Sequence, residues 1–203
     1  MPSTIATSLI RRSISILAIV LAVALLAGCV SDPEAPASFN PSAACNGADS
    51  QVMAGAYPEL EGLLPTSLSG VAPTSVVSGR LCSAKTLGTL YTAGIRETHF
   101  GSAVWDHGDG SGIQMTIMEA TGLTVANALE SYDNGAASAP KVHLLTAQDV
   151  TVNGIAGQQL NIENDDFQQK VVIWPTGTPG RLHVLIASNT LAADLQVALD
   201  AFH

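Results

Sequence analysis

Residues 105–112, WDHGDGSG, bring together the side chains best suited to chemistry in this chain of 203 residues. Asp106 and Asp109 supply carboxylate oxygens, and the glycines can expose backbone carbonyls, which are the ligands that a hard cation such as Ca²⁺ prefers. An EF-hand loop also needs oxygen ligands at its third and fifth positions and Glu at its twelfth, where this segment has two glycines and Ile117. The pattern is more typical of a polar hairpin tip built on Asp and Gly turn residues.

Ser111 raises the question of nucleophilic catalysis. A nucleophile elbow has the form G-x-S-x-G between a strand and a helix, whereas Ser111 has Asp109 and Ile113 two residues away and lies between two predicted strands. The five histidines form neither an HxH nor an HExxH spacing, so the sequence predicts no metal centre and no cofactor. No catalytic residue is assigned, and an enzyme with its site near residues 105–112 remains the alternative.

Aromatic side chains are scarce, at two Trp, three Tyr and four Phe. A platform for a sugar or a base needs exposed rings. Only Trp105 and Trp174, each at the predicted end of a strand, are placed to form one, and the alternative is that both rings cap the core. Together with Asp106 and Asp109, they are the candidate ligand-binding residues.

The elements that would position these residues follow from the hydrophobic periodicity. Residues 95–105 and 113–120 form a predicted hairpin, because apolar and polar side chains alternate along its second arm, as in a strand with one buried face. Four more predicted strands follow: 141–148, 149–164 as a pair about Asn153-Gly154, 167–174 and 181–188. Helical spacing occurs in three segments: 78–93, 121–135 with Thr124 as N-cap, and 190–203 capped by Asn189 or Thr190.

Hairpin connections dominate this order of elements, so the sheet is predicted to be mainly antiparallel. We expect an α+β fold, with a sheet of about six strands and with helices packed on one face. Residues 57–203 hold these elements and are long enough for a single domain.

The composition is acidic, with 17 Asp and Glu against 8 Lys and Arg. The formal net charge is −9, and no cluster of basic residues offsets it. Such a charge repels phosphate backbones, so a nucleic-acid partner is excluded as a class.

The first 28 residues have the layout of an export signal. Arg11 and Arg12 precede an apolar run of 13 residues, 14–26, which is too short for the roughly 20 residues of a membrane span. The run ends in LAGC, residues 26–29. This ending resembles the lipobox of bacterial lipoproteins. The resemblance implies that the Cys29 thiol is lipidated and that the signal peptide is cut just before it.

This resemblance predicts a protein held in the membrane by its N-terminal lipid and facing the extracytoplasmic side, with the outer membrane as its place in a cell with two membranes. Removal of residues 1–28 leaves six basic and 17 acidic residues, a net charge of −11. Two alternatives stay open: an ordinary signal with Cys29 as a spare thiol, and twin-arginine export directed by Arg11-Arg12.

Two further cysteines, Cys45 and Cys82, form an even remainder. In an oxidising compartment they are predicted to form one disulfide, which closes a loop of 38 residues. The rival interpretation, a metal or redox site with two thiols, lacks CxxC spacing.

Residues 29–56 are rich in Pro, Ala, Ser, Asn and Gly, and they contain few large apolar side chains. Such a composition predicts a flexible spacer between the lipidated cysteine and the domain. The strong anchor signal and the missing catalytic motif favour a non-catalytic module that binds an envelope protein or a small ligand. An envelope hydrolase or a metal-dependent enzyme is the alternative.

Overall fold

The structure is a computed structural model that describes residues 40–45, 50–108 and 110–203. Within these residues the strands are β1 (Ser50–Met53), β2 (Ser75–Leu81), β3 (Thr98–Asp106), β4 (Gly112–Glu119), β5 (Leu144–Val152), β6 (Ile155–Glu163), β7 (Gln168–Pro175) and β8 (Arg181–Ser188). The helices are α2 (Pro58–Glu61), α3 (Ala84–Leu87), α4 (Thr89–Thr92), α5 (Val125–Ala137) and α6 (Ala192–Ala201).

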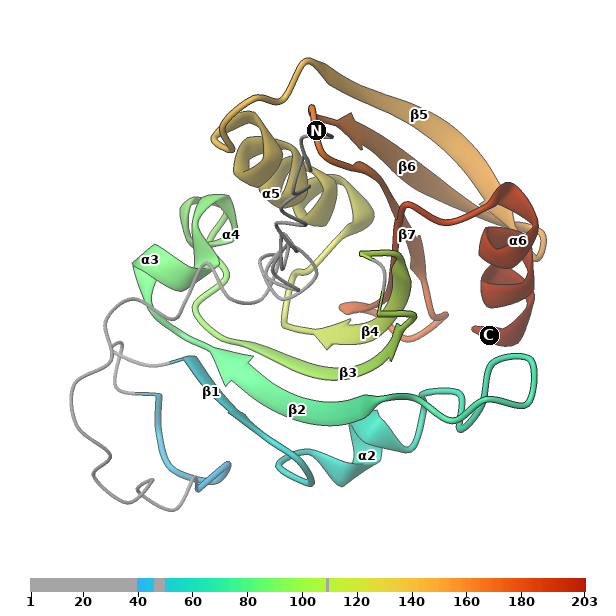
Figure 1. Ribbon diagram of the computed structural model, residues 1–203. Coiled ribbons are helices and arrows are strands. Elements are labelled where there is room, and N and C mark those ends of the chain that lie inside the picture. The colour runs from blue at the N-terminus through green and yellow to red at the C-terminus, as the bar shows by residue number, and fades with distance from the viewer. Residues whose placement is uncertain (1–39, 46–49, 109) are drawn as a thin grey trace, which may run out of the picture.

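The strands form one antiparallel sheet in the order β1-β2-β3-β4-β8-β7-β6-β5. The sheet is curved, with α5 in its hollow and α2 on the opposite side (Figure 1). The predicted α+β class and the antiparallel sheet are confirmed. The strand count is eight within the described residues, rather than the expected six.

The two additional strands are β1 and β2. Part of β2 lies in the segment 78–93 that was expected to be one helix, and the helical remainder is split into α3 and α4 at Gly88, whose φ is +53°. Gly79 explains why a strand forms here, since a Cβ at this position would lie 2.1 Å from the backbone oxygen of Gln51 in β1. Only glycine lets the two backbones pair this closely.

Helices cover both faces of the sheet, so the expectation that they pack on one face was wrong. On the convex face, α2 and α6 pack on a core around Trp174 and Phe202, named here the convex core. On the concave face, α3, α4 and α5 pack on a core around Phe100 and Ile173, named the concave core. Strands β4 and β8 are buried along nearly their whole length, so neither face can stay in water.

Strand β1 lies inside the segment 29–56 that was expected to be a spacer. Its residues pair with β2, and Ala56 is buried in the convex core. The folded domain therefore starts before the expected boundary at Tyr57. Residues 1–39, which include Cys29 and the expected signal peptide, lie outside the described residues. In the part that is described, no helix has the length and apolar character needed to cross a bilayer.

The ends of two helices test the sequence signals directly. Helix α5 starts at the predicted cap, because the Thr124 hydroxyl accepts a bond from the Asn127 backbone N–H and the Asn127 side chain accepts one from the Thr124 N–H. Helix α6 lacks its expected cap. Asn189 and Thr190 instead bond the carbonyls of Gly110 and Gly112, which fastens the β3–β4 loop to the chain before α6.

Candidate functional site

A cavity of about 470 Å³ lies between the concave face of the sheet and helices α3, α4 and α5. This volume falls within the range of roughly 300–1,000 Å³ that is usual for sites that bind small molecules. The cavity is the candidate functional site.

Apolar side chains form most of the cavity wall. The sheet contributes Phe100, Met118 and Ile162, and the helices contribute Leu87, Leu90 and Ala128. All six residues belong to the concave core and are at most 8% exposed. The wall can therefore bury an apolar ligand.

Polar side chains from β4 form part of the cavity floor. Gln114 and Thr116 are 4% and 5% exposed, although sequence alternation had placed them on a solvent-facing strand side. The Gln114 amide Nε2 donates to the hydroxyl of Ser102 on β3 at 3.1 Å and to that of Thr116 at 3.3 Å. Thr116 in turn donates to Ser102 at 3.0 Å. These bonds hold the side chains in fixed positions beneath the cavity.

A second polar pair lies at the same end of the concave face. Gln169 of β7 lines the cavity, and its Nε2 donates to the Ser188 hydroxyl of β8 at 3.0 Å. Strand β8 lies between β4 and β7, so Ser188 is on the strand next to Gln114 and Gln169 is one strand further away. The floor therefore offers uncharged hydrogen-bonding groups within an apolar wall, which is the usual composition of a site that orients a small ligand.

Tyr132 of α5 lines the cavity from the helix side. Burial raises its pKa to about 12, so the phenol is neutral and can donate a hydrogen bond across the physiological range. Lys85 of α3 is the one charged residue among the described lining residues, and its side chain is exposed.

The expected site at residues 105–112 is a hairpin tip between β3 and β4. The Asp106 carboxylate accepts a bond from the Gly108 N–H at 2.8 Å, so it closes a turn. His107 Nδ1 lies 3.1 Å from the Ser111 hydroxyl, and the His107 N–H donates to the Ser111 carbonyl at 3.2 Å. Asp109 lies outside the described residues. Across the described chain, no three His, Cys, Asp or Glu side chains gather as metal ligands would.

Both tryptophans lie in the convex core. Trp105 is 3% exposed and donates its indole N–H to the Val71 carbonyl at 2.9 Å. Trp174 is 1% exposed and stacks on His183, with ring centroids 4.9 Å apart. Of the two roles considered for these rings, the structure places them in the core, on the sheet face opposite the cavity.

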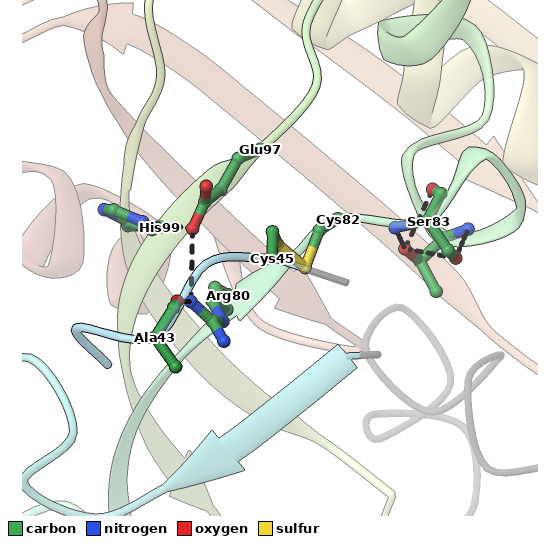
Figure 2. Close-up of a disulfide and its surroundings, with 8 residues drawn as sticks. Ala43, Cys45, Arg80, Cys82, Ser83, Glu97 and His99 are labelled. Atoms are coloured by element: carbon green, nitrogen blue, oxygen red, sulfur yellow. Dashed lines mark hydrogen bonds and ion pairs between the residues drawn. A yellow bond between two sulfur atoms is a disulfide. The ribbon is translucent and has the colours of Figure 1, made fainter. Parts of the chain in front are cut away.

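The predicted disulfide between Cys45 and Cys82 is confirmed, with 6.0 Å between the two Cα atoms (Figure 2). It fastens residues 40–45 to the end of β2. Beside it, the buried Arg80 guanidinium donates to the Ala43 carbonyl and lies 3.6 Å from the Glu97 carboxylate. The disulfide and the Arg80 guanidinium therefore both hold residues 40–45 in place.

Sequence reasoning missed the cavity residues because they come from separate segments between residues 81 and 169. One signal was present. Met118 lies on the same side of the predicted strand as Gln114 and Thr116. An apolar residue on this otherwise polar side indicates that other elements cover it.

A comparison of the chain with protein-family models, with curated proteins and with solved structures finds no match.

Proposed function

We propose that this protein is a lipid-anchored extracytoplasmic module that binds a small, largely apolar ligand without chemical conversion. The observation that carries the proposal is the cavity of about 470 Å³ under α3, α4 and α5. Burial of apolar surface contributes about 25 cal/mol per Å². A small apolar ligand enclosed in this cavity can therefore bind through the hydrophobic effect without any charged contact.

The structure favours this proposal over the enzyme alternative on two grounds. None of the described residues 105–108 and 110–112 lines the cavity. The contact between His107 and Ser111 closes a turn, and the His107 side chain is exposed to solvent. The pair therefore does not lie in the enclosed pocket that nucleophilic catalysis needs.

Filling the cavity tests the proposal. Ala136 of α5 lines the cavity, whereas the next residue, Ala137, is exposed on the same helix. In the full chain reconstituted in phospholipid nanodiscs, we expect Ala136→Phe to weaken pyrene binding by about tenfold or more, because the ring occupies space that the probe needs. Pyrene fluorescence, corrected for empty nanodiscs, measures the affinity.

Ala137→Phe is the matched control, since it adds the same ring outside the cavity. We expect its pyrene affinity to stay within about twofold of the wild type. Absence of saturable pyrene binding to the wild-type chain, or an equal loss in the two variants, would contradict the proposal.

The anchor is tested separately through Cys29. We expect the wild-type protein extracted from membranes to have the mass of a chain that begins at Cys29 and carries acyl groups. Cys29→Ser removes the only acceptor thiol of the lipobox, so we expect this variant to lack the acyl mass and to leave the membrane fraction or remain uncleaved. Intact-mass spectrometry reads both results. An unacylated wild-type chain would contradict the lipoprotein assignment.

A further inference from the structure

We infer that the ligand of this cavity is an uncharged amphiphile that carries a hydroxyl or carbonyl oxygen into the cavity. The inference rests on the proposed function and names the chemical class of its ligand. Three observations carry it: the charge of the lining, the polar groups left without a partner, and the charge of the whole chain.

The cavity lining has almost no charge. None of the described lining residues is acidic, although the chain has 17 Asp and Glu. Among these described residues Lys85 alone is basic, and its exposed position keeps its ammonium group in water. A charged group taken into such a cavity would lose its hydration without gaining an ion pair, so an uncharged ligand is favoured.

Three polar groups of the lining have no hydrogen-bond partner among the described residues. The Thr89 hydroxyl of α4 is fully buried and unpaired. Within the described chain no hydrogen bond reaches the Tyr132 hydroxyl, and none reaches the carbonyl end of the Gln114 amide, whose Nε2 is already used. A ligand with an oxygen function can pair with such groups, whereas a pure hydrocarbon leaves them unsatisfied.

These three groups match one kind of ligand atom. A hydroxyl both donates and accepts, so it can pair with the Gln114 carbonyl as well as with the Thr89 and Tyr132 hydroxyls. A carbonyl oxygen accepts from the two hydroxyls only. Since burial keeps the Tyr132 phenol neutral, no ionised partner is available from it for a cationic ligand.

The field of the whole protein acts against an anionic ligand. The formal net charge is −9, and it becomes −11 when residues 1–28 are removed. A negative surface potential lowers the local concentration of anions and slows their association. A fatty acid would therefore enter less readily than the alcohol of the same chain length.

The experiment compares two probes that differ only in the end group. With the full chain in nanodiscs at pH 8, 1-decanol and decanoate each displace pyrene from the cavity. We expect 1-decanol to bind at least about tenfold more tightly than decanoate, because the carboxylate would meet no buried cation among the described lining residues to offset its lost hydration. Equal or tighter binding of decanoate, lost on Lys85→Ala, would overturn the inference and identify an anion held at the rim.

Two substitutions test the hydrogen bonds. We expect Thr89→Val and Tyr132→Phe each to weaken 1-decanol binding about fivefold while pyrene, which has no oxygen, binds as before. Matched controls are Thr92→Val and Tyr91→Phe on α4, because Thr92 and Tyr91 are exposed and do not line the cavity. We expect both controls to bind 1-decanol like the wild type.

The outcomes separate the two proposals. If pyrene does not bind the wild-type chain, the proposed function fails and the inference fails with it. If pyrene binds and neither Thr89→Val nor Tyr132→Phe affects 1-decanol, the cavity binds apolar molecules without recognising the oxygen, and only the inference is overturned.

Discussion

Removal of the disulfide should lower the free energy of unfolding by about 4 kcal/mol. Cys45 and Cys82 are 37 positions apart, and a crosslink that closes a loop of this length reduces the entropy of the unfolded chain by about that amount. Domains of this size are stable by only about 5–15 kcal/mol, so the loss is a large share of the total. The double variant Cys45→Ala/Cys82→Ala tests this in urea.

Alanine is the suitable replacement because Cys82 is 5% exposed, and a serine hydroxyl there would need a partner. The buried Trp105 and Trp174 report unfolding through their fluorescence. Wild-type protein treated with reductant should match the double variant, and reductant should leave the double variant unchanged. An identical urea midpoint for oxidised wild type and double variant would contradict the prediction.

Reduction should also loosen the segment before β1. The Ala43 carbonyl accepts a bond from Arg80, which is 4% exposed, and the disulfide keeps that carbonyl in place (Figure 2). Without the crosslink the Ala43 carbonyl is free to move away, while the Glu97 carboxylate still lies 3.6 Å from the same nitrogen atom. Part of the loss is therefore expected to come from the native state, because a buried cation loses a bond.

Elements with local signals could be predicted from the sequence. Helix α5 has a capping box at Thr124 and Asn127, and its apolar residues recur with helical spacing, so no distant contact is needed to specify it. The hairpin of β5 and β6 turns at Asn153-Gly154, where both residues have positive φ, as the turn type requires.

Elements that depend on distant partners could not be predicted. Strand β1 has four residues and pairs with β2, which begins 22 positions after the last residue of β1. Helical spacing in 78–93 misled because Leu87 and Leu90 do face the concave core, but from two short helices on either side of Gly88. Tertiary pairing of Gly79 with β1 decided the outcome.

The candidate site shows the same limit more strongly. Alternation along β4 correctly put Ile113 on one face and Gln114 on the other. Alternation gives the side of the sheet, but it says nothing about what covers that side. Helices α3, α4 and α5 cover it, and this turns expected solvent-facing groups into the floor of a cavity.

A second large effect is expected from acid, through His183 of β8. This residue is 6% exposed, and its ring stacks on Trp174. The Phe202 ring meets it in an edge-on arrangement, with 4.5 Å between the two ring centroids. Its buried Nδ1 has no hydrogen-bond partner among the described residues. Burial, and secondarily the charge of His203, lowers the pKa of His183 to about 4.

The direction of the pH dependence follows from that lowered pKa. In the unfolded chain a histidine has a pKa of about 6.5, so between roughly pH 6.5 and 4 the unfolded state binds more protons than the folded state. The free energy of unfolding should therefore fall as the pH falls through this window, by about 3 kcal/mol in total at pH 4. Above about pH 7 the same residue should cause no pH dependence.

Replacement of His183 by leucine isolates this effect, because leucine is close in volume and cannot bind a proton. Carboxylates titrate in the same window, so each protein serves as its own reference. The change in unfolding free energy from pH 7.5 to about pH 4 is measured for the wild type and for His183→Leu, and the two changes are compared. The variant should lose about 3 kcal/mol less than the wild type. His143→Leu, at a side chain that is 55% exposed, should retain the wild-type acid sensitivity. If His183→Leu loses as much stability on acidification as the wild type, the buried imidazole is not the group that makes the convex core sensitive to acid.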